Sequence, residues 1–327
     1  MKTGMVELDF KDIDWLHIRQ ALSLSLLKNR AVAVRHGAAF LEGSPEYQPL
    51  FNDLALAVAA IGAGRLTLEG DDIIYEPLLL PPGRYRLDTG PRSSAVELLL
   101  FLMPALHHGD FRSVLRLSGV THSVLSYPTT FVKQTLLTVL ERLGFYGSLT
   151  LKRFGFYGSG GGSMESRIYP QEPGHSPAFA GEHNRSVSGV RIFISRLDAR
   201  LAELEKRLLS VELELDTGRI SIIEVQDSDG IGNSVQVFVD CGGLPVVLFR
   251  EMNLYGEGEG IIMSENDLRA QLAGLALETR ELIMGETLPG RLMREIYPYL
   301  ILTGNDGGLG GQACQGTITG DLCGRFL

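Results

Sequence analysis

The stretch "GFYGSGGG" at residues 155–162 decides how the middle of this chain folds, because five of its eight residues are glycine. It lies between two strand-like runs, whereas a phosphate-binding loop of the P-loop or Rossmann kind leads into the N-terminus of a helix. It also lacks the lysine of a P-loop. We therefore interpret Gly155, Gly160, Gly161 and Gly162 as a structural signature, where segments of backbone cross closely between strands.

The hydrophobic pattern on both sides of this stretch changes between the period of a helix and that of a strand. It predicts helices at residues 18–27, 46–61, 93–106, 129–143, 197–209 and 265–284, and strands at 31–35, 65–77, 113–119, 148–156, 187–195, 211–216, 220–226, 233–240 and 245–253. In the first half, two or so strands and a helix recur roughly every 45 residues, which indicates a repeated α/β unit.

A change in composition marks a domain boundary. In "YPQEPGHSPAFAGEHNRS", residues 169–186, Pro, Gly and His accumulate and the hydrophobic period lapses, as is typical of a connecting segment. We predict a main domain formed by residues 1–185 and 280–327. A smaller α/β domain, residues 186–279, is predicted to be inserted into it.

Composition restricts the class of protein. The 327 residues are 44% hydrophobic and 21% charged, which predicts a folded protein with a substantial core. The net charge of −9 argues against a broad nucleic-acid surface and leaves room for a local basic one. Three scattered cysteines, no signal-peptide pattern and no apolar run of ~20 residues predict a cytoplasmic protein without a membrane span.

Two local motifs invite a chemical interpretation. His122, in "SGVTHSV", follows a strand and has no evident carboxylate partner in sequence. Asp227 and Asp229, in "VQDSDGIGNS", resemble the start of a calcium loop, but the Glu that such a loop needs further on is missing. A turn between strands explains these two better, so we predict no metal site from the residues themselves.

Several stretches occur in an order and spacing typical of one family. They are "IRQALSLSLL" (18–27), "SSAVELLLFLMPAL" (93–106), "SGVTHSVLSYPTTFVKQTLLTVLERLG" (118–144), "RFGFYGSGGG" (153–162), "DSDGIGNSVQVFV" (227–239) and "YPYLILTG" (297–304). Together they resemble the RNA 3'-terminal phosphate cyclases, from about residue 16 to the C-terminus. The resemblance implies a main domain of three repeated α/β units, related to the enolpyruvyl transferase fold, with a smaller inserted domain.

The resemblance also implies a chemistry. Active members use ATP and a divalent metal to convert an RNA 3'-phosphate into a 2',3'-cyclic phosphate. A histidine near the C-terminus attacks the α-phosphate, the adenylate passes to the RNA, and the neighbouring 2'-hydroxyl displaces AMP. Such a covalent intermediate divides one difficult step into easier ones.

This sequence departs from the family pattern at the positions that would face a ligand. Gln315 stands where the nucleophilic histidine is expected, and a carboxamide cannot form the phosphoramidate. The segment "DIDWL" (12–16) replaces an acidic-Gly-Gly-Gly-Gln signature, and "GAAFLEGSPEYQP" (37–49) replaces a basic loop. His122 takes the place of an aspartate, while Arg19 and the glycine signature are retained.

We therefore expect a cyclase-like pseudoenzyme that binds or scaffolds in RNA processing, with an RNA 3' end or a protein as its partner. The alternative is an active ATP-dependent cyclase with magnesium, whose nucleophile is supplied elsewhere, for instance by His122. A third possibility is another nucleotide-dependent transferase that uses Arg19, His122 and Asp306. Arg19 and Asp306 are the residues predicted to bind phosphate or nucleotide.

Overall fold

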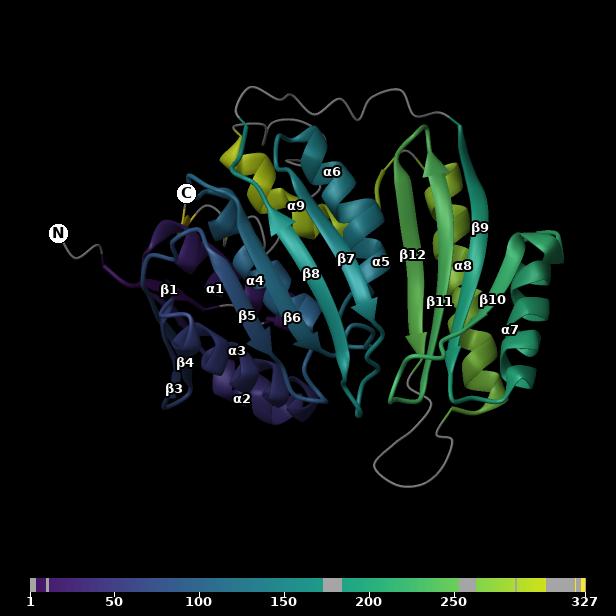
Figure 1. Cartoon of the computed structure of the whole chain (residues 1–327), viewed down its shortest axis with the longest axis horizontal. Coiled ribbons are helices and arrows are strands. Elements are labelled where there is room, and N and C mark those ends of the chain that lie inside the picture. Colours follow the sequence, from purple (N-terminus) through teal and green to yellow (C-terminus); the bar gives the residue numbers. More distant parts are fainter. Residues whose placement is uncertain are drawn as a thin grey trace.

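The structure is a computed structural model, and it describes residues 4–9, 12–172, 184–252, 263–285, 287–303, 321 and 325–326. Over these residues the chain forms three four-stranded sheets with helices packed against them (Figure 1). The predicted α/β class is confirmed.

The first unit contains residues 6–77. Its elements are β1 (Val6–Leu8), α1 (Trp15–Lys28), β2 (Val32–Val34), α2 (Gly37–Gly43), a 3-10 turn (Pro45–Tyr47), α3 (Gln48–Ala60), β3 (Gly64–Glu69) and β4 (Asp72–Pro77). The strand order is β1-β2-β4-β3. β1 and β2 are parallel, and the other pairs are antiparallel.

The second unit, residues 84–168, repeats that topology. It contains β5 (Arg84–Asp88), α4 (Ala95–His107), β6 (Ser113–Gly119), α5 (Thr129–Phe131), a π turn (Val132–Leu136), α6 (Leu137–Arg142), β7 (Gly147–Arg153) and β8 (Gly162–Ile168). Its order is β5-β6-β8-β7, with the first pair again parallel. Helices α1 and α4 pack against each other between the two sheets. The described residues thus show a repeated α/β unit, but each copy has four strands, and the predicted period of roughly 45 residues was wrong.

The third sheet has a different topology. It contains β9 (Arg185–Ser195), β10 (Ile220–Glu224), β11 (Gly232–Cys241) and β12 (Pro245–Met252) in the order β10-β9-β11-β12. Helices α7 (Ala199–Glu212) and α8 (Glu265–Met284) pack against each other and against this sheet. The limits of an inserted domain at residues 186–279 stay a prediction.

The last helix, α9 (Gly290–Leu302), returns to the first two units and contacts α6. The expected third unit stays a prediction, since residues 304–320 lie outside the described residues. Within the described part of the chain, no helix combines the length and the hydrophobicity that crossing a bilayer requires.

Two sequence predictions of local structure were wrong. The run at residues 65–77 is a hairpin, with β3 and β4 joined at Gly70, whose φ of 63° suits glycine. The alternating "VELELD" at 211–216 is not a strand, because α7 continues to Glu212 and ends there. Leu213 and Leu215 then pack on the core as parts of a turn, so a short alternation did not distinguish the two structures.

Candidate functional site

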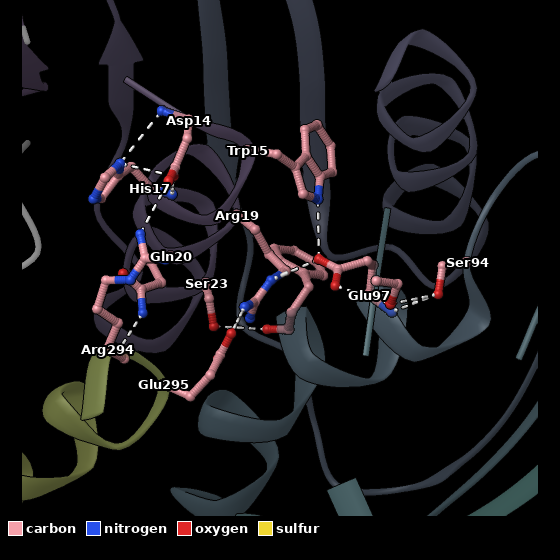
Figure 2. A network of polar contacts seen from close by, with 12 residues as sticks. Asp14, Trp15, His17, Arg19, Gln20, Ser23, Ser94, Glu97, Arg294 and Glu295 are labelled. Atoms are coloured by element: carbon pink, nitrogen blue, oxygen red, sulfur yellow. Dashed lines mark hydrogen bonds and ion pairs between the residues drawn. The ribbon is translucent and has the colours of Figure 1, made fainter. Parts of the chain in front are cut away.

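The side chain of Arg19 forms the centre of a buried polar cluster between α1, α4 and α9 (Figure 2). Arg19 is only 3% exposed. Its Nε lies 2.8 Å from Oε2 of Glu97 on α4, and its Nη2 forms an ion pair with Oε1 of Glu295 on α9. The retained arginine is thus held by two carboxylates from two other helices.

Neighbouring side chains donate hydrogen bonds to the two carboxylates. The indole Nε1 of Trp15 donates to Oε2 of Glu97 at 2.9 Å, and the hydroxyl of Ser126 donates to Oε1 at 3.1 Å. The hydroxyl of Tyr127 hydrogen bonds Glu295. Every carboxylate in the cluster is therefore supplied with at least one donor besides Arg19, as buried charges require.

Electrostatics favour a charged Arg19 in this cluster. Burial alone would lower the pKa of Arg19, but Glu295 and Glu97 together raise it above its ordinary value. Burial raises the pKa of Glu295, an effect that Arg19 opposes and Glu97 strengthens. The guanidinium thus remains a cation, and its charge is already matched by protein groups.

A third ion pair lies at the start of α1 (Figure 2). Asp14 caps this helix by accepting from the backbone N–H of His17 at 2.9 Å, and its Oδ2 lies 3.0 Å from Nη1 of Arg294 on α9. Burial opposes ionisation of Asp14, but the bonds from His17 and the charge of Arg294 prevail and lower its pKa to about 2. The N-terminus of α1 and helix α9 are therefore joined by the ion pair between Asp14 and Arg294.

Arg19 and Glu97 of the cluster, together with Asp14 and Arg294, border a cavity of about 340 Å³. Trp15 and Tyr47 stack beside it with ring centres 5.6 Å apart. On the other side Phe249 of β12 lines it, and the guanidinium of Arg291 lies 4.9 Å from the centre of that ring. Its volume is within the range of sites for small ligands.

Each of the three arginines that line the cavity has a carboxylate partner. Arg19 pairs with Glu97 and Glu295, Arg294 with Asp14, and Arg291 with Glu278 at 3.2 Å. A phosphate entering the cavity would have to compete with these carboxylates. It would find Arg291 and Arg294 more readily than Arg19, because their side chains are 29% and 38% exposed.

The structure does not place His122 in the lining of this cavity, although Val124, two residues further on, lines it. Its ring is 2% exposed and stacks on Phe154 with centres 4.7 Å apart. Nδ1 lies 3.0 Å from the hydroxyl of Thr121, and Nε2 has no hydrogen-bond partner among the described residues. Burial lowers the pKa of His122 to about 3, so the ring is neutral. His122 is not among the residues that line the cavity with Arg19.

The glycine signature forms a close crossing of backbone. A Cβ on Gly155 or Gly162 would lie 2.3 or 2.6 Å from the carbonyl oxygen of Gly119, the last residue of β6. Gly160 and Gly161 have φ of 65° and 71°, which only glycine adopts readily. The carbonyl of Gly155 accepts from the backbone N–H groups of Thr121 and His122. These contacts agree with a structural interpretation of the loop.

Gln315 and Asp306 lie outside the described residues. No group of three or more His, Cys, Asp or Glu residues that could hold a metal ion gathers in the described ranges. The first two acidic residues of the rejected calcium loop, Asp227 and Asp229, both pair with Arg153 at 2.9 Å. They thereby join the third sheet to the glycine loop, where Arg153 also donates to the carbonyl of Gly161.

Sequence reasoning missed most of the residues that surround Arg19. Glu97 offered a signal, because it is one charge in the apolar helix "AVELLLFLMPAL", and buried charges are rarely unpaired. Glu295, Arg291 and Arg294 gave no such signal, because nothing in the sequence indicates which helices pack against α9.

The fold and the cavity define an α/β protein of repeated units with an arginine-lined cleft. A family model for RNA 3'-terminal phosphate cyclase matches residues 16–187. Among similar proteins, RNA 3'-terminal phosphate cyclase of Pseudomonas fluorescens is 30% identical over 71% of this chain and 68% of that protein. The proteins of that name from Ectopseudomonas mendocina and Koribacter versatilis are 26% and 28% identical, over 74% and 68% of this chain and 71% and 63% of theirs. The chain belongs to the RNA 3'-terminal phosphate cyclase family.

Proposed function

We propose that this chain is a cyclase-like binding protein that does not adenylate itself or RNA. The observation that supports this most is the pairing of every arginine around the cavity with a carboxylate of the chain. Arg19 in particular is enclosed by Glu97 and Glu295. A catalytic site for phosphates needs cations that are free to meet developing charge.

Gln315, at the expected position of the nucleophile, supports the same proposal from the sequence. His122, offered as a substitute nucleophile, is neutral, enclosed by aromatic rings and not part of the cavity lining. Both routes to a phosphoramidate therefore lack support, while the cavity still has the size and lining of a binding site.

An active ATP-dependent cyclase is the alternative, and one observation favours it. Three arginines and the stacked rings of Trp15 and Tyr47 meet at a single cavity, which suits a ligand with both an aromatic base and phosphates. In that case Arg291 and Arg294 would exchange their carboxylates for phosphate, and ATP with a divalent metal would supply the activation.

The test is incubation with α-labelled ATP and Mg²⁺, followed by a search for acid-labile label on the chain. The cyclase of Pseudomonas fluorescens serves as the positive control. We expect no label and no cyclisation of a 3'-phosphorylated oligonucleotide, and gain of label in Gln315→His would trace the loss to that position. Label on the unaltered chain would refute the proposal, and loss of that label in His122→Ala would identify His122 as the nucleophile.

A further inference from the structure

The outer face of the second sheet carries a concentration of cations. Strands β5, β6, β8 and β7 lie side by side, with α4 behind them (Figure 1). Alternate side chains of a strand point to opposite faces, and here one set is buried against the helices. The other set includes the cations Arg84, Arg86, Arg116, Lys152 and Arg167 and the anions Asp88 and Glu165.

These cations are exposed, and only some have partners. Glu165 pairs with Arg116 at 3.1 Å and with Arg167 at 3.2 Å, and the two arginine side chains remain 70% and 53% exposed. Arg84, Arg86 and Lys152 are exposed and have no ion pair within the described part of the chain. A net positive face therefore exists on a chain whose net charge is −9.

The fold does not require this charge, as the first sheet shows. Its topology is the same, but the charges at its outward positions are mainly acidic. They are Glu7, Glu69, Asp72 and Glu76 against Arg65, and Arg35, directly after β2, pairs with Glu7 and Asp72. The same strand arrangement therefore forms with a net negative outer face in the first sheet. We infer that folding does not require the cations of the second sheet.

The spacing and the type of the side chains on the outer face of the second sheet indicate which kind of polyanion it would bind. Arg84 and Arg86 are two residues apart on one strand, which separates them by about 6.6 Å, and neighbouring strands are about 4.8 Å apart. Arginine binds phosphate through two parallel N–H bonds. The outward positions 84, 86, 88, 114, 116, 118, 148, 150, 152, 163, 165 and 167 hold no aromatic side chain and one apolar residue, Val114.

A protein partner would normally meet an apolar centre within a polar rim, and this face has no such centre. A row of phosphates needs only spaced cations and hydroxyls, and Ser118, Ser148, Thr150 and Ser163 lie among the arginines. The twelve outward positions hold no aromatic ring to stack on bases, and the exposed Tyr169 lies just beyond the end of β8. Contact along the strands would therefore be with phosphates and independent of sequence.

We propose that the open face of the second sheet binds the phosphate backbone of single-stranded RNA. This inference extends the proposed binding function to a surface apart from the cavity, and it does not depend on whether the cavity is catalytic. It names phosphates along the strand, not the 3' end, as the groups that are contacted.

The test is fluorescence anisotropy with labelled oligouridine that ends in a 3'-hydroxyl, over a series of salt concentrations. The logarithm of the association constant should fall with the logarithm of salt, with a slope of about −0.7 per phosphate contacted. Arg86→Glu should reduce the steepness by at least about 0.7, and Arg84→Glu with Arg86→Glu by about twice that. Urea unfolding of each variant would verify that it is folded.

Arg65→Glu is the matched control, because Arg65 is an exposed, outward arginine of the first sheet that has no ion pair among the described residues. It makes the same change of net charge and should leave the slope unchanged. Equal weakening by Arg65→Glu and Arg86→Glu, or no salt-dependent binding, would overturn the inference. Tighter binding of an oligoglutamate of equal charge would also overturn it and indicate an acidic protein partner.

The design separates this inference from the proposed function. RNA with a 3'-hydroxyl cannot be cyclised, so an active cyclase would still bind it through the sheet. If RNA binding were lost in Arg294→Ala and kept in Arg84→Glu/Arg86→Glu, the cavity and not the sheet would be the RNA site. Such a result would refute the inference and leave the labelling test with ATP unaffected.

Discussion

The first and second sheets have the same strand order and the same directions, yet they differ on the side that faces away from the helices. Their middle rows correspond by register: Glu7, Ala33, Ile74 and Thr67 in the first, and Arg86, Arg116, Glu165 and Thr150 in the second. The inner rows of both are apolar. The comparison shows that burial fixes the repeated unit, while the outer row is free to acquire a separate role.

The largest effect is expected at the buried contact between the units, where Arg19 of α1 pairs with Glu97 of α4 and Glu295 of α9. Arg19→Met leaves Glu97 and Glu295 buried without a cation, and we expect it to lower the free energy of unfolding by about 3–5 kcal/mol. Urea unfolding at neutral pH measures this. The matched control is Arg19→Met with Glu97→Leu and Glu295→Leu, which should recover most of the loss. A loss below about 1 kcal/mol in the single variant would show that the pair behaves as an exposed one.

The turns between the last two strands of each unit distinguish the two copies further. Gly162→Ala would place a Cβ 2.6 Å from the backbone oxygen of Gly119, and we expect a loss of about 3 kcal/mol, the upper part of the range for overpacking. Gly70→Ala in the first unit has open space and only a positive φ, so about 1 kcal/mol is expected. Equal losses in urea unfolding would contradict the close crossing of backbone.

The loops that follow the second strand of each unit both carry a histidine, with opposite pKa shifts. Burial lowers the pKa of His122 to about 3. Its contribution to stability is therefore complete above the ordinary value of 6.5 and is lost as pH falls from 6.5 toward 3. The hydrogen bond that the His36 ring donates to the Asp71 carboxylate raises the pKa of His36, so its contribution to stability is complete below 6.5 and is lost as pH rises through the folded value.

We expect His122→Phe to flatten the acid side of the stability profile and His36→Asn to flatten the side above pH 6.5. Unfolding by urea at a series of pH values measures both, and NMR titration of the ring protons assigns each pKa. The second effect should be the smaller, because His36 is exposed. A His122 ring that titrates near 6.5 would show that it is open to water.

The sequence predicted that an α/β unit repeats, but not the length of the unit or all of its strands. Long helices with a clear period, such as α4 and α8, lie where the pattern predicts them. Strands β1 and β5 were missed, because VEL is too short to show a period and the outward arginines of RYRLD conceal the single buried Leu87. The family resemblance supplied the α/β class and named Arg19, while Gln315 and Asp306 lie outside the described residues.

Partners of a buried residue are harder to predict than its position. Arg19 and Glu97 are 78 residues apart by number, and Glu295 comes from a helix near the other end of the chain. Periodicity places each residue on a helix face but does not say which helices meet. His122 was a reasonable candidate in sequence for the same reason, since its burial depends on Phe154 and on Phe193 of the third sheet.

The smallest expected effects on stability come from the outer rows, where the two units differ most. Arg86→Glu should change the free energy of unfolding by no more than about 0.5 kcal/mol, because the side chain is exposed and has no ion pair in the described residues. Its counterpart Glu7→Arg loses an exposed pair with Arg35 at 3.0 Å, worth about 0.2–1 kcal/mol. Urea unfolding of the two variants, at low and high salt, provides the measurement. A cost for Arg86→Glu as large as that for Gly162→Ala would mean that the cations of the second sheet hold the fold together, and the argument for a separate binding role would fail.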